Sequence, residues 1–240
     1  MTALSDACAA WSRRRHLPAP VVAGADAWTV DLAIGGLRLR ALRADDVARL
    51  LDFAVRLGER GKALFCPYPW DEPAKLPGAF AAAIAQHQRR IDAMYLIEDG
   101  AACIAHGFLW KAGGNPHSAA HGVEVPELGV AVAEAWQGRG LGSLLVRALQ
   151  GAAIDLGRDA VELTTAMEND RGWETYLSAG FVLTGIIRTP LGVDVTAATL
   201  GQVAATRWRD ERQLVWMARP DRRGRVERYL AIKRDEAQRL

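Results

Sequence analysis

Three glycines occur in the segment Gln137-Gly138-Arg139-Gly140-Leu141-Gly142, which lies between an expected strand and an amphipathic helix. Glycine has no Cβ to hold an anion away from the backbone, and a helix N-terminus carries free N–H groups and about half a positive charge. The segment therefore predicts a phosphate-binding turn. It lacks the Gly-Lys-Ser/Thr ending of a Walker loop, and Ser143 stands where a dinucleotide fingerprint needs a third glycine. Taken alone, it could also be a glycine turn that binds nothing.

A second pattern follows downstream, Asn-x-x-small-x-x-apolar-Tyr-x-x-x-Gly-Phe. It is matched at Asn169, Gly172, Tyr176, Gly180 and Phe181, with Thr175 where an apolar residue is usual. With both motifs in this order and spacing, the sequence resembles the GNAT superfamily of acyl-CoA-dependent N-acyltransferases, whose first signature is Gln/Arg-x-x-Gly-x-Gly/Ala. The resemblance covers most of the chain, but not the first 27 residues or the tail after Met217.

The resemblance implies acetyl-CoA as the acyl donor, with no metal. Its diphosphate would lie on the amides of the glycine turn, and its pantetheine arm along a strand edge near Val130 and Val132. Asn169 would cap its helix, bind the arm, or do both. The residues expected to contact acetyl-CoA are Val130, Val132, Gln137, Gly138, Arg139, Gly140, Gly142, Ser143, Asn169 and Tyr176.

Aminolysis of a thioester needs a neutral amine, yet an alkylamine with a pKa of about 10.4 is almost wholly protonated at pH 7. By the resemblance, Glu127 would be the base, acting directly or through water, with Glu124 as the alternate base. Glu127 could instead only anchor the substrate. Tyr176 occupies the family's acid position and would protonate the leaving thiolate, although its helix stripe could also bury the ring.

The resemblance says less about the residues that would contact the amine acceptor. Tyr68, Trp70, Trp110, Glu124 and the loop Thr189–Gln213 are expected to face the acceptor. A small-molecule amine is favoured over a protein lysine or N-terminus, because the loop lacks the tyrosines that relatives acting on peptide N-termini often carry. A non-catalytic acyl-CoA-binding module is the alternative from another class.

Hydrophobic periodicity predicts the elements that must position these residues. Strands are expected at 28–34, 37–42, 94–97, 101–110, 127–133, 161–165, 181–188 and 214–217. Helices are expected at 3–15, from Asp45 or Asp46 to near Gly58, after Pro77, from Leu141 and at 169–179, and Asp45 or Asp46 can cap the second of them. An irregular connection is expected from Gly58 to Pro77. The fold class is α/β (α+β), a GNAT fold with a central mixed, mostly antiparallel sheet, a splayed V between its central strands and flanking helices.

Composition excludes several other classes. Of the 240 residues, 50% are hydrophobic and 24% charged, which is typical of a globular protein. The 30 Lys and Arg against 28 Asp and Glu give a formal charge of +2, too balanced to indicate nucleic-acid or membrane partners. Cys8, Cys66 and Cys103 form no disulfide or zinc pattern, and no targeting or membrane segment is evident. We expect a cytoplasmic protein, compatible with a homodimer.

The predicted domain division has three parts. Residues 1–27 form a helical appendage and linker, 28–218 the acetyltransferase domain, and 219–240 a basic tail.

Overall fold

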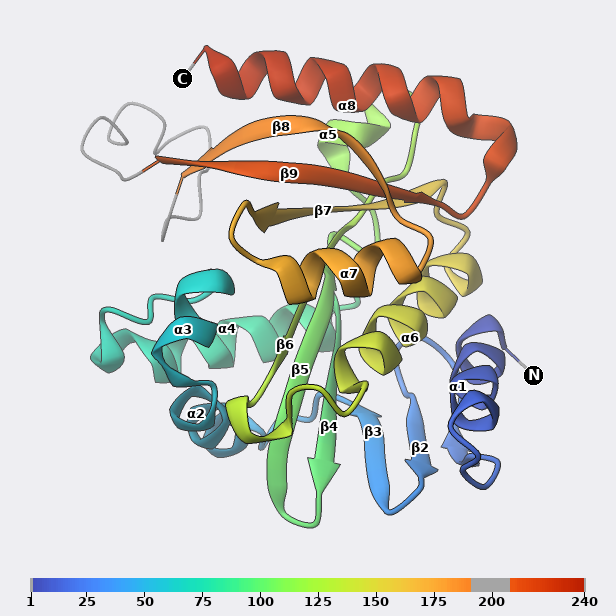
Figure 1. Cartoon of the computed structure of the whole chain (residues 1–240), viewed down its shortest axis with the longest axis vertical. Coiled ribbons are helices and arrows are strands. Elements are labelled where there is room, and N and C mark those ends of the chain that lie inside the picture. The colour runs from blue at the N-terminus through green and yellow to red at the C-terminus, as the bar shows by residue number, and fades with distance from the viewer. Residues whose placement is uncertain (1, 191–207, 240) are drawn as a thin grey trace.

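The computed structural model describes residues 2–190 and 208–239 (Figure 1). Its strands form one sheet in the order β1-β2-β3-β4-β5-β6-β7-β9-β8. The strands are β1 Val21–Gly24, β2 Asp31–Ile34, β3 Leu37–Ala41, β4 Ala93–Asp99, β5 Ala102–Trp110, β6 Glu127–Val132, β7 Ala160–Ala166, β8 Val182–Pro190 and β9 Trp208–Met217.

One strand pairing differs from all the others in this sheet. Every neighbouring pair is antiparallel except β6 and β7, which are parallel and meet only at Glu127 and Glu162. Figure 1 shows the result, because β4 to β6 and β7 to β9 run in clearly different directions. The predicted mixed, mostly antiparallel sheet with a V between central strands is confirmed, and beyond Glu127 β7 leaves the edge of β6 unpaired.

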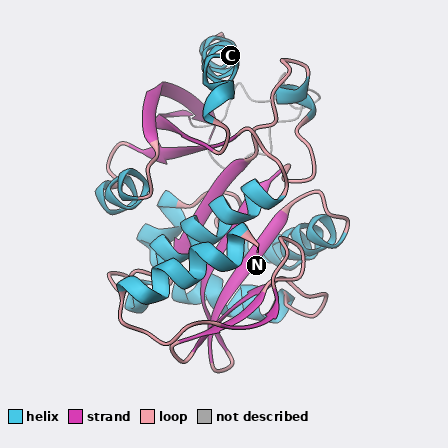
Figure 2. Cartoon of the chain, turned by 90° about the vertical axis from the view of Figure 1, so that its right-hand side faces the viewer, coloured by secondary structure: helices cyan, strands magenta, loops and turns pink. Residues whose placement is uncertain are grey.

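Helices cover both sides of the strands (Figure 2). Helices α1 Ala3–Arg14 and α6 Leu141–Asp155 lie over one cluster of buried apolar side chains. Helices α2 Val47–Arg56 and α4 Leu76–Gln88 close a second cluster, with α3 Gly58–Leu64 between them in the chain. The remaining helices are α5 Pro116–Ala119, α7 Asp170–Ser178 and α8 Arg223–Gln238.

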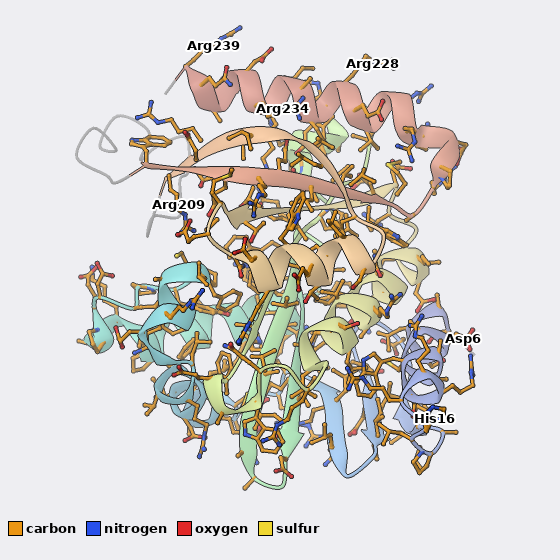
Figure 3. The ribbon with its side chains drawn as sticks, in the orientation of Figure 1. Asp6, His16, Arg209, Arg228, Arg234 and Arg239 are labelled. Atoms are coloured by element: carbon orange, nitrogen blue, oxygen red, sulfur yellow. The ribbon has the colours of Figure 1, made fainter. Side chains whose placement is uncertain are left out.

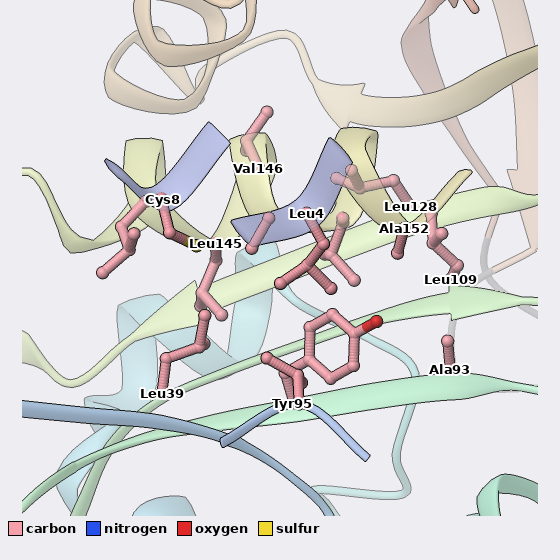
Figure 4. Close-up of a cluster of buried hydrophobic side chains, with 14 of the residues drawn as sticks. Leu4, Cys8, Leu39, Ala93, Tyr95, Leu109, Leu128, Leu145, Val146 and Ala152 are labelled. Carbon is pink, nitrogen blue, oxygen red and sulfur yellow. The ribbon is translucent and has the colours of Figure 1, made fainter. Parts of the chain in front are cut away.

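The N-terminal helix is part of the packed core. Leu4 and Cys8 of α1 are buried against α6 and the sheet (Figure 4). A Cβ on Gly151 of α6 would stand 2.4 Å from the Cα of Leu4, so only glycine permits this close approach. The carboxylate of Asp155, at the end of α6, accepts the N–H of Ala3 at 2.8 Å. Because the start of α1 lies at the end of α6, its last turn lies near the start of α6.

The C-terminal helix also packs on the sheet. Val226, Tyr229 and Leu230 of α8 are buried with Val215 of β9. Arg234 lies on the side of α8 that faces β8 and β9 (Figure 3) and donates to Gln213 at 2.7 Å. Both terminal segments therefore contact the central part of the chain, and the division into three parts stays a prediction.

Several predicted elements need correction. The linker before Ala27 contains β1, a short and mostly exposed edge strand whose few residues show no apolar alternation. The connection from Gly58 to Pro77 contains α3 and a 3₁₀ turn, Pro73–Lys75, neither of which buries a residue and so neither shows periodicity. Strand β9 begins at Trp208, so the expected acceptor loop is shorter, and its residues 191–207 lie outside the described residues.

The predicted cap of α2 is also wrong. Asp46 occupies the N-cap position but makes no capping hydrogen bond. Its buried carboxylate instead pairs with Arg40 at 2.7 Å and accepts the N–H of Arg43. Arg40 also pairs with Glu98 of β4, which is distant in the sequence. A buried guanidinium needs anionic partners more than a helix end needs a cap, because an uncompensated buried charge is far costlier.

Candidate functional site

The glycine turn joins the end of β6 to the start of α6. The chain leaves β6, forms the 3₁₀ turn η2 Glu134–Trp136, and enters α6 at Gly140. Gly138 has φ of 75° and Gly140 has φ of 82°, a region that residues with a Cβ rarely adopt. Gly140 holds the N-cap position, and glycine brings no side chain to accept the first N–H groups of the helix.

The backbone N–H groups of this turn are unpaired. Within the described part of the chain, the amides from Gly138 to Ser143 donate to no other residue, and the first helical bond runs from Leu144 N–H to the Gly140 carbonyl at 3.0 Å. A Cβ on Gly142 would meet only methyl groups of Val132 and Thr175, at 3.8 and 3.9 Å. The turn therefore presents consecutive donors and the positive end of α6, which together suit a phosphate group.

Side chains brace the turn from both sides. Gln137 donates through Nε2 to the Val132 carbonyl at 3.2 Å and accepts at Oε1 from Arg171 of α7 at 3.1 Å. The guanidinium of Arg139 lies 4.4 Å from the ring centroid of Trp136. The first signature is thus held between the end of β6 and α7.

The predicted residues on β6 and α7 lie close to this turn. Val130 and Val132 are half-buried and pack against the cluster beneath α6. Asn169 caps α7, accepting the N–H of Gly172 at 3.1 Å, while its Nδ2 donates to Thr165 at 2.9 Å. A contact of Asn169 with the pantetheine arm stays a prediction, because its side chain already has partners in the protein.

Glu127 lies at the opposite end of β6, where the sheet splits. It stands opposite Trp110 of β5 and Glu162 of β7. The ammonium of Lys233, from α8, lies 2.9 Å from Glu162 and 3.7 Å from Glu127. Burial raises the pKa of Glu127, Lys233 opposes this, and Glu162 raises the pKa further. With its side chain 33% exposed, Glu127 remains accessible to a reactant.

Glu124, the alternate base, lies three residues earlier and is already engaged. Its carboxylate pairs with Arg158 at 3.0 Å and accepts the N–H of Asn115. Two donors therefore already occupy the Glu124 carboxylate. The geometry favours Glu127 over Glu124.

Tyr176 lies on the buried side of α7. Its ring centroid is 5.9 Å from that of Phe181, and its hydroxyl makes no hydrogen bond to any described residue. Burial raises the pKa of Tyr176, and the charge of Glu211 raises it further. The phenol is therefore protonated at neutral pH and has a proton to donate.

A sequence model of the Acetyltransferase (GNAT) family matches residues 62–181, half of the chain, and this span contains both motifs. The chain belongs to the GNAT acetyltransferase family. No curated protein sequence matches this GNAT chain.

Solved GNAT structures show the same fold at low sequence identity. The ribosomal-protein-S5-alanine acetyltransferase from Vibrio fischeri is 13% identical, with TM-score 0.58 over 79% of this chain and 97% of that one. The putative acetyltransferase yncA from Salmonella typhimurium, solved with acetyl-CoA, is 16% identical, with TM-score 0.55 over 77% and 95%. A mutant spermidine N-acetyltransferase SpeG from Vibrio cholerae is 17% identical, with TM-score 0.53 over 76% and 94%.

The three aromatic acceptor candidates of this GNAT protein pack against one cluster of buried side chains. Trp110 lies beside Glu127 and stacks on Phe108, with ring centroids 4.5 Å apart. Tyr68 is buried, its hydroxyl 2.9 Å from Nε2 of His106, and Trp70 donates to the carbonyl of Phe65. Trp110 is the member of this cluster that stands opposite Glu127, whereas Tyr68 and Trp70 make their polar contacts within the cluster.

Sequence reasoning missed the basic partner of Glu127. Lys233 lies in the segment predicted as a tail, and no local pattern marks it. Among the described residues, no group of three or more His, Cys, Asp or Glu side chains is arranged to hold a metal ion. Likewise, no helix in residues 2–190 and 208–239 is long and apolar enough to cross a membrane.

Proposed function

We propose that this GNAT protein transfers an acetyl group from acetyl-CoA to a primary amine by direct attack, and that the amine is a small molecule. The unpaired amides from Gly138 to Ser143 carry this proposal. Their placement at the start of α6 supports diphosphate binding, since each unpaired donor gains a charge-assisted hydrogen bond there.

Acetyl-CoA supplies a thioester whose carbonyl carbon is open to attack by nitrogen. The turn residues Gly138, Arg139, Gly140, Gly142 and Ser143 would hold the diphosphate, with Gln137 bracing them. The edge of β6 that β7 leaves unpaired, near Val130 and Val132, would pair with the pantetheine arm as an added strand does.

Glu127 would act as the general base. It takes one proton from the acceptor ammonium, the neutral nitrogen then forms the N–C bond, and the C–S bond breaks. A pKa raised above the ordinary value makes Glu127 a stronger base, and Lys233 opposes that rise by favouring the ionised carboxylate. Tyr176 would donate its proton to the departing sulfur; burial keeps the phenol protonated before this step but also raises its pKa, so the transfer is driven by the charge that develops on the sulfur. The nitrogen loses its second proton to solvent as the amide forms, and solvent returns a proton to Tyr176 after the thiol has left.

The surroundings of Glu127 support a small cationic acceptor. Glu162 and Glu211 add negative charge, and Trp110 offers an aromatic face beside the carboxylate. These carboxylates and the indole would attract an ammonium group through charge and cation–π interaction, although Lys233 and Lys111 lie on the same side and oppose part of that attraction. The solved relatives include enzymes named for spermidine and for a ribosomal protein, so both acceptor classes belong in the test.

The test is a thiol-release assay with acetyl-CoA and a panel containing spermidine, an aminoglycoside, a lysine peptide and a peptide with N-terminal alanine. We expect thiol release with a small amine, and mass spectrometry should find one acetyl group on its nitrogen. Release with a peptide alone would overturn the proposed acceptor class. Coenzyme binding without release on any acceptor would contradict the proposed transfer.

A further inference from the structure

The last turn of α1 reaches the glycine turn. Trp11 donates from Nε1 to the carbonyl of Gly140 at 3.2 Å, and the guanidinium of Arg15 lies 5.1 Å from the centroid of the Trp11 ring. A Cβ on Gly140 would overlap Nη2 of Arg15, so the guanidinium rests directly on the N-cap residue of α6. Figure 3 marks this end of α1 with the label of His16, the next residue.

This position is unfavourable for a cation in the protein alone. The start of α6 is the positive end of a helix and repels a guanidinium, and the contact that holds Arg15 there is with the Trp11 ring rather than with an anion. No carboxylate in the described part of the chain forms an ion pair with Arg15 or Arg139. Arg147, about two turns further along α6, has its pKa lowered by burial and by nearby Arg14. Positive charge therefore accumulates around amides that are themselves donors.

The contact comes from outside the part of the chain that the family model matches, residues 62–181. It is also firmly positioned. Helix α1 is anchored by Leu4 and Cys8 in the core and by the carboxylate of Asp155 at its first turn. The side chain of Arg15 is exposed, which leaves its remaining N–H donors available to a ligand.

We propose that Arg15 is a binding residue for the diphosphate of acetyl-CoA, supplied to the glycine turn by the N-terminal helix. The inference rests on the proposed function, in which that turn holds the cofactor. A diphosphate between the guanidinium and the amides resolves the excess of positive charge, and a guanidinium matches phosphate oxygens in a bidentate manner. The diphosphate is favoured over the 3′-phosphate because Arg15 lies on Gly140 itself.

The experiment measures binding of coenzyme A by titration calorimetry to the full chain and three variants. Arg15→Met keeps an aliphatic stem over Trp11 but removes the charge, and Arg15→Lys keeps the charge. Arg13→Met is the matched control, since Arg13 is exposed on the same last turn and its side chain makes no polar contact with the described residues. We expect Arg15→Met to weaken binding roughly tenfold, Arg15→Lys to recover most of it, and Arg13→Met to match the wild type.

Two further measurements assign the cause. The affinity of Arg15→Met should depend less on salt than that of the wild type, because one screened charge contact is gone. With 3′-dephospho-coenzyme A the loss should stay roughly tenfold, whereas a vanishing loss would move the contact to the 3′-phosphate and overturn the diphosphate assignment. Wild-type affinity in Arg15→Met would overturn the inference and leave the proposed function standing. Absence of coenzyme binding by the wild type would overturn the proposed function itself.

Discussion

The two ends of β6 differ in the charged groups that surround them. At its start, Glu127 stands beside Glu162, and both carboxylates lie near the ammonium of Lys233. Beyond its other end, the amides of the glycine turn from Gly138 to Ser143 have no partner among the described residues, and the guanidinium of Arg15 lies against Gly140. One end places two carboxylates beside an ammonium, and the other places unpaired N–H donors beside Arg15, which forms no ion pair with a carboxylate in the described part of the chain.

This difference assigns a separate task to each end. The six residues of β6 span about 17 Å at roughly 3.4 Å per residue, so the two ends act at distinct parts of a long, extended ligand. The end with excess positive charge suits the diphosphate of the proposed cofactor, and the acidic end suits an ammonium. Changes at one end should therefore alter binding of the cofactor, and changes at the other should alter turnover.

The largest effect on turnover is expected from Glu127→Gln. The amide cannot accept the proton of the acceptor, so turnover should fall roughly 1000-fold, within the range for a lost general base. Coenzyme affinity should stay at the wild-type value, because the change lies at the far end of β6. Steady-state kinetics and calorimetry on the same preparation check both statements. Unchanged turnover would remove Glu127 from the proton transfer.

The middle of the same strand region should control stability rather than function. His106 of β5 pairs with Ala131 of β6, and burial lowers the pKa of His106 to about 4, although its bond to the Tyr95 carbonyl opposes this. The unfolded value is about 6.5. Because the folded state resists protonation, the free energy of unfolding should fall by about 3 kcal/mol as pH drops from about 6.5 to about 4.

Urea unfolding at several pH values measures that slope. His106→Gln should flatten the dependence between these pH values, while His16→Asn at the exposed end of α1 should leave it intact. An identical slope in His106→Gln and the wild type would assign the acid sensitivity to other groups.

Gly142→Asp tests whether the glycine turn binds the diphosphate. A carboxylate in the first turn of α6 neutralises the helix end and stabilises the helix slightly, but it repels a diphosphate. We expect coenzyme affinity to fall about 50-fold with no loss in melting temperature. Gly142→Ala is the control, since a methyl group there meets only ordinary contacts and should cost much less. Equal affinity in both variants would place the diphosphate elsewhere.

The smallest expected effect is at Lys233. Its ammonium favours the ionised form of Glu127, so Lys233→Met should raise the pKa of Glu127 and move the acid limb of the activity profile to higher pH. Lys233→Arg keeps the charge and should restore the wild-type limb. Measuring kcat/KM against pH checks this, with the melting temperature as a check on the packing of α8. A limb unmoved in Lys233→Met would mean that the acid limb reports another group.

Patterns within short segments of the sequence predicted the elements whose structure depends on those segments alone. The glycine turn, the strand ending in it and the helix after it follow from glycine spacing and apolar periodicity, so the sequence alone places Gly140 and Gly142 at the start of a helix. The resemblance to GNAT proteins added Glu127 and Tyr176. Short or exposed elements such as β1 and α3 bury too little to leave a pattern.

Contacts between distant segments could not be predicted in this way. Lys233 reaches Glu127 from α8, and Arg15 reaches Gly140 from α1, through packing that joins both chain ends to the sheet. Asp46 looked like a helix cap because its position fits one, yet Arg40 takes its carboxylate. In each case the partner is set by the tertiary fold, and one sequence without its fold contains no signal for it.

The most direct test of the central claim follows the turn amides themselves. In ¹⁵N-labelled protein titrated with coenzyme A, the backbone resonances from Gly138 to Ser143 should show the largest shifts of the chain, and they should saturate at the affinity measured by calorimetry. Coenzyme binding that leaves these resonances in place would contradict the account, because the diphosphate would then lie away from the start of α6.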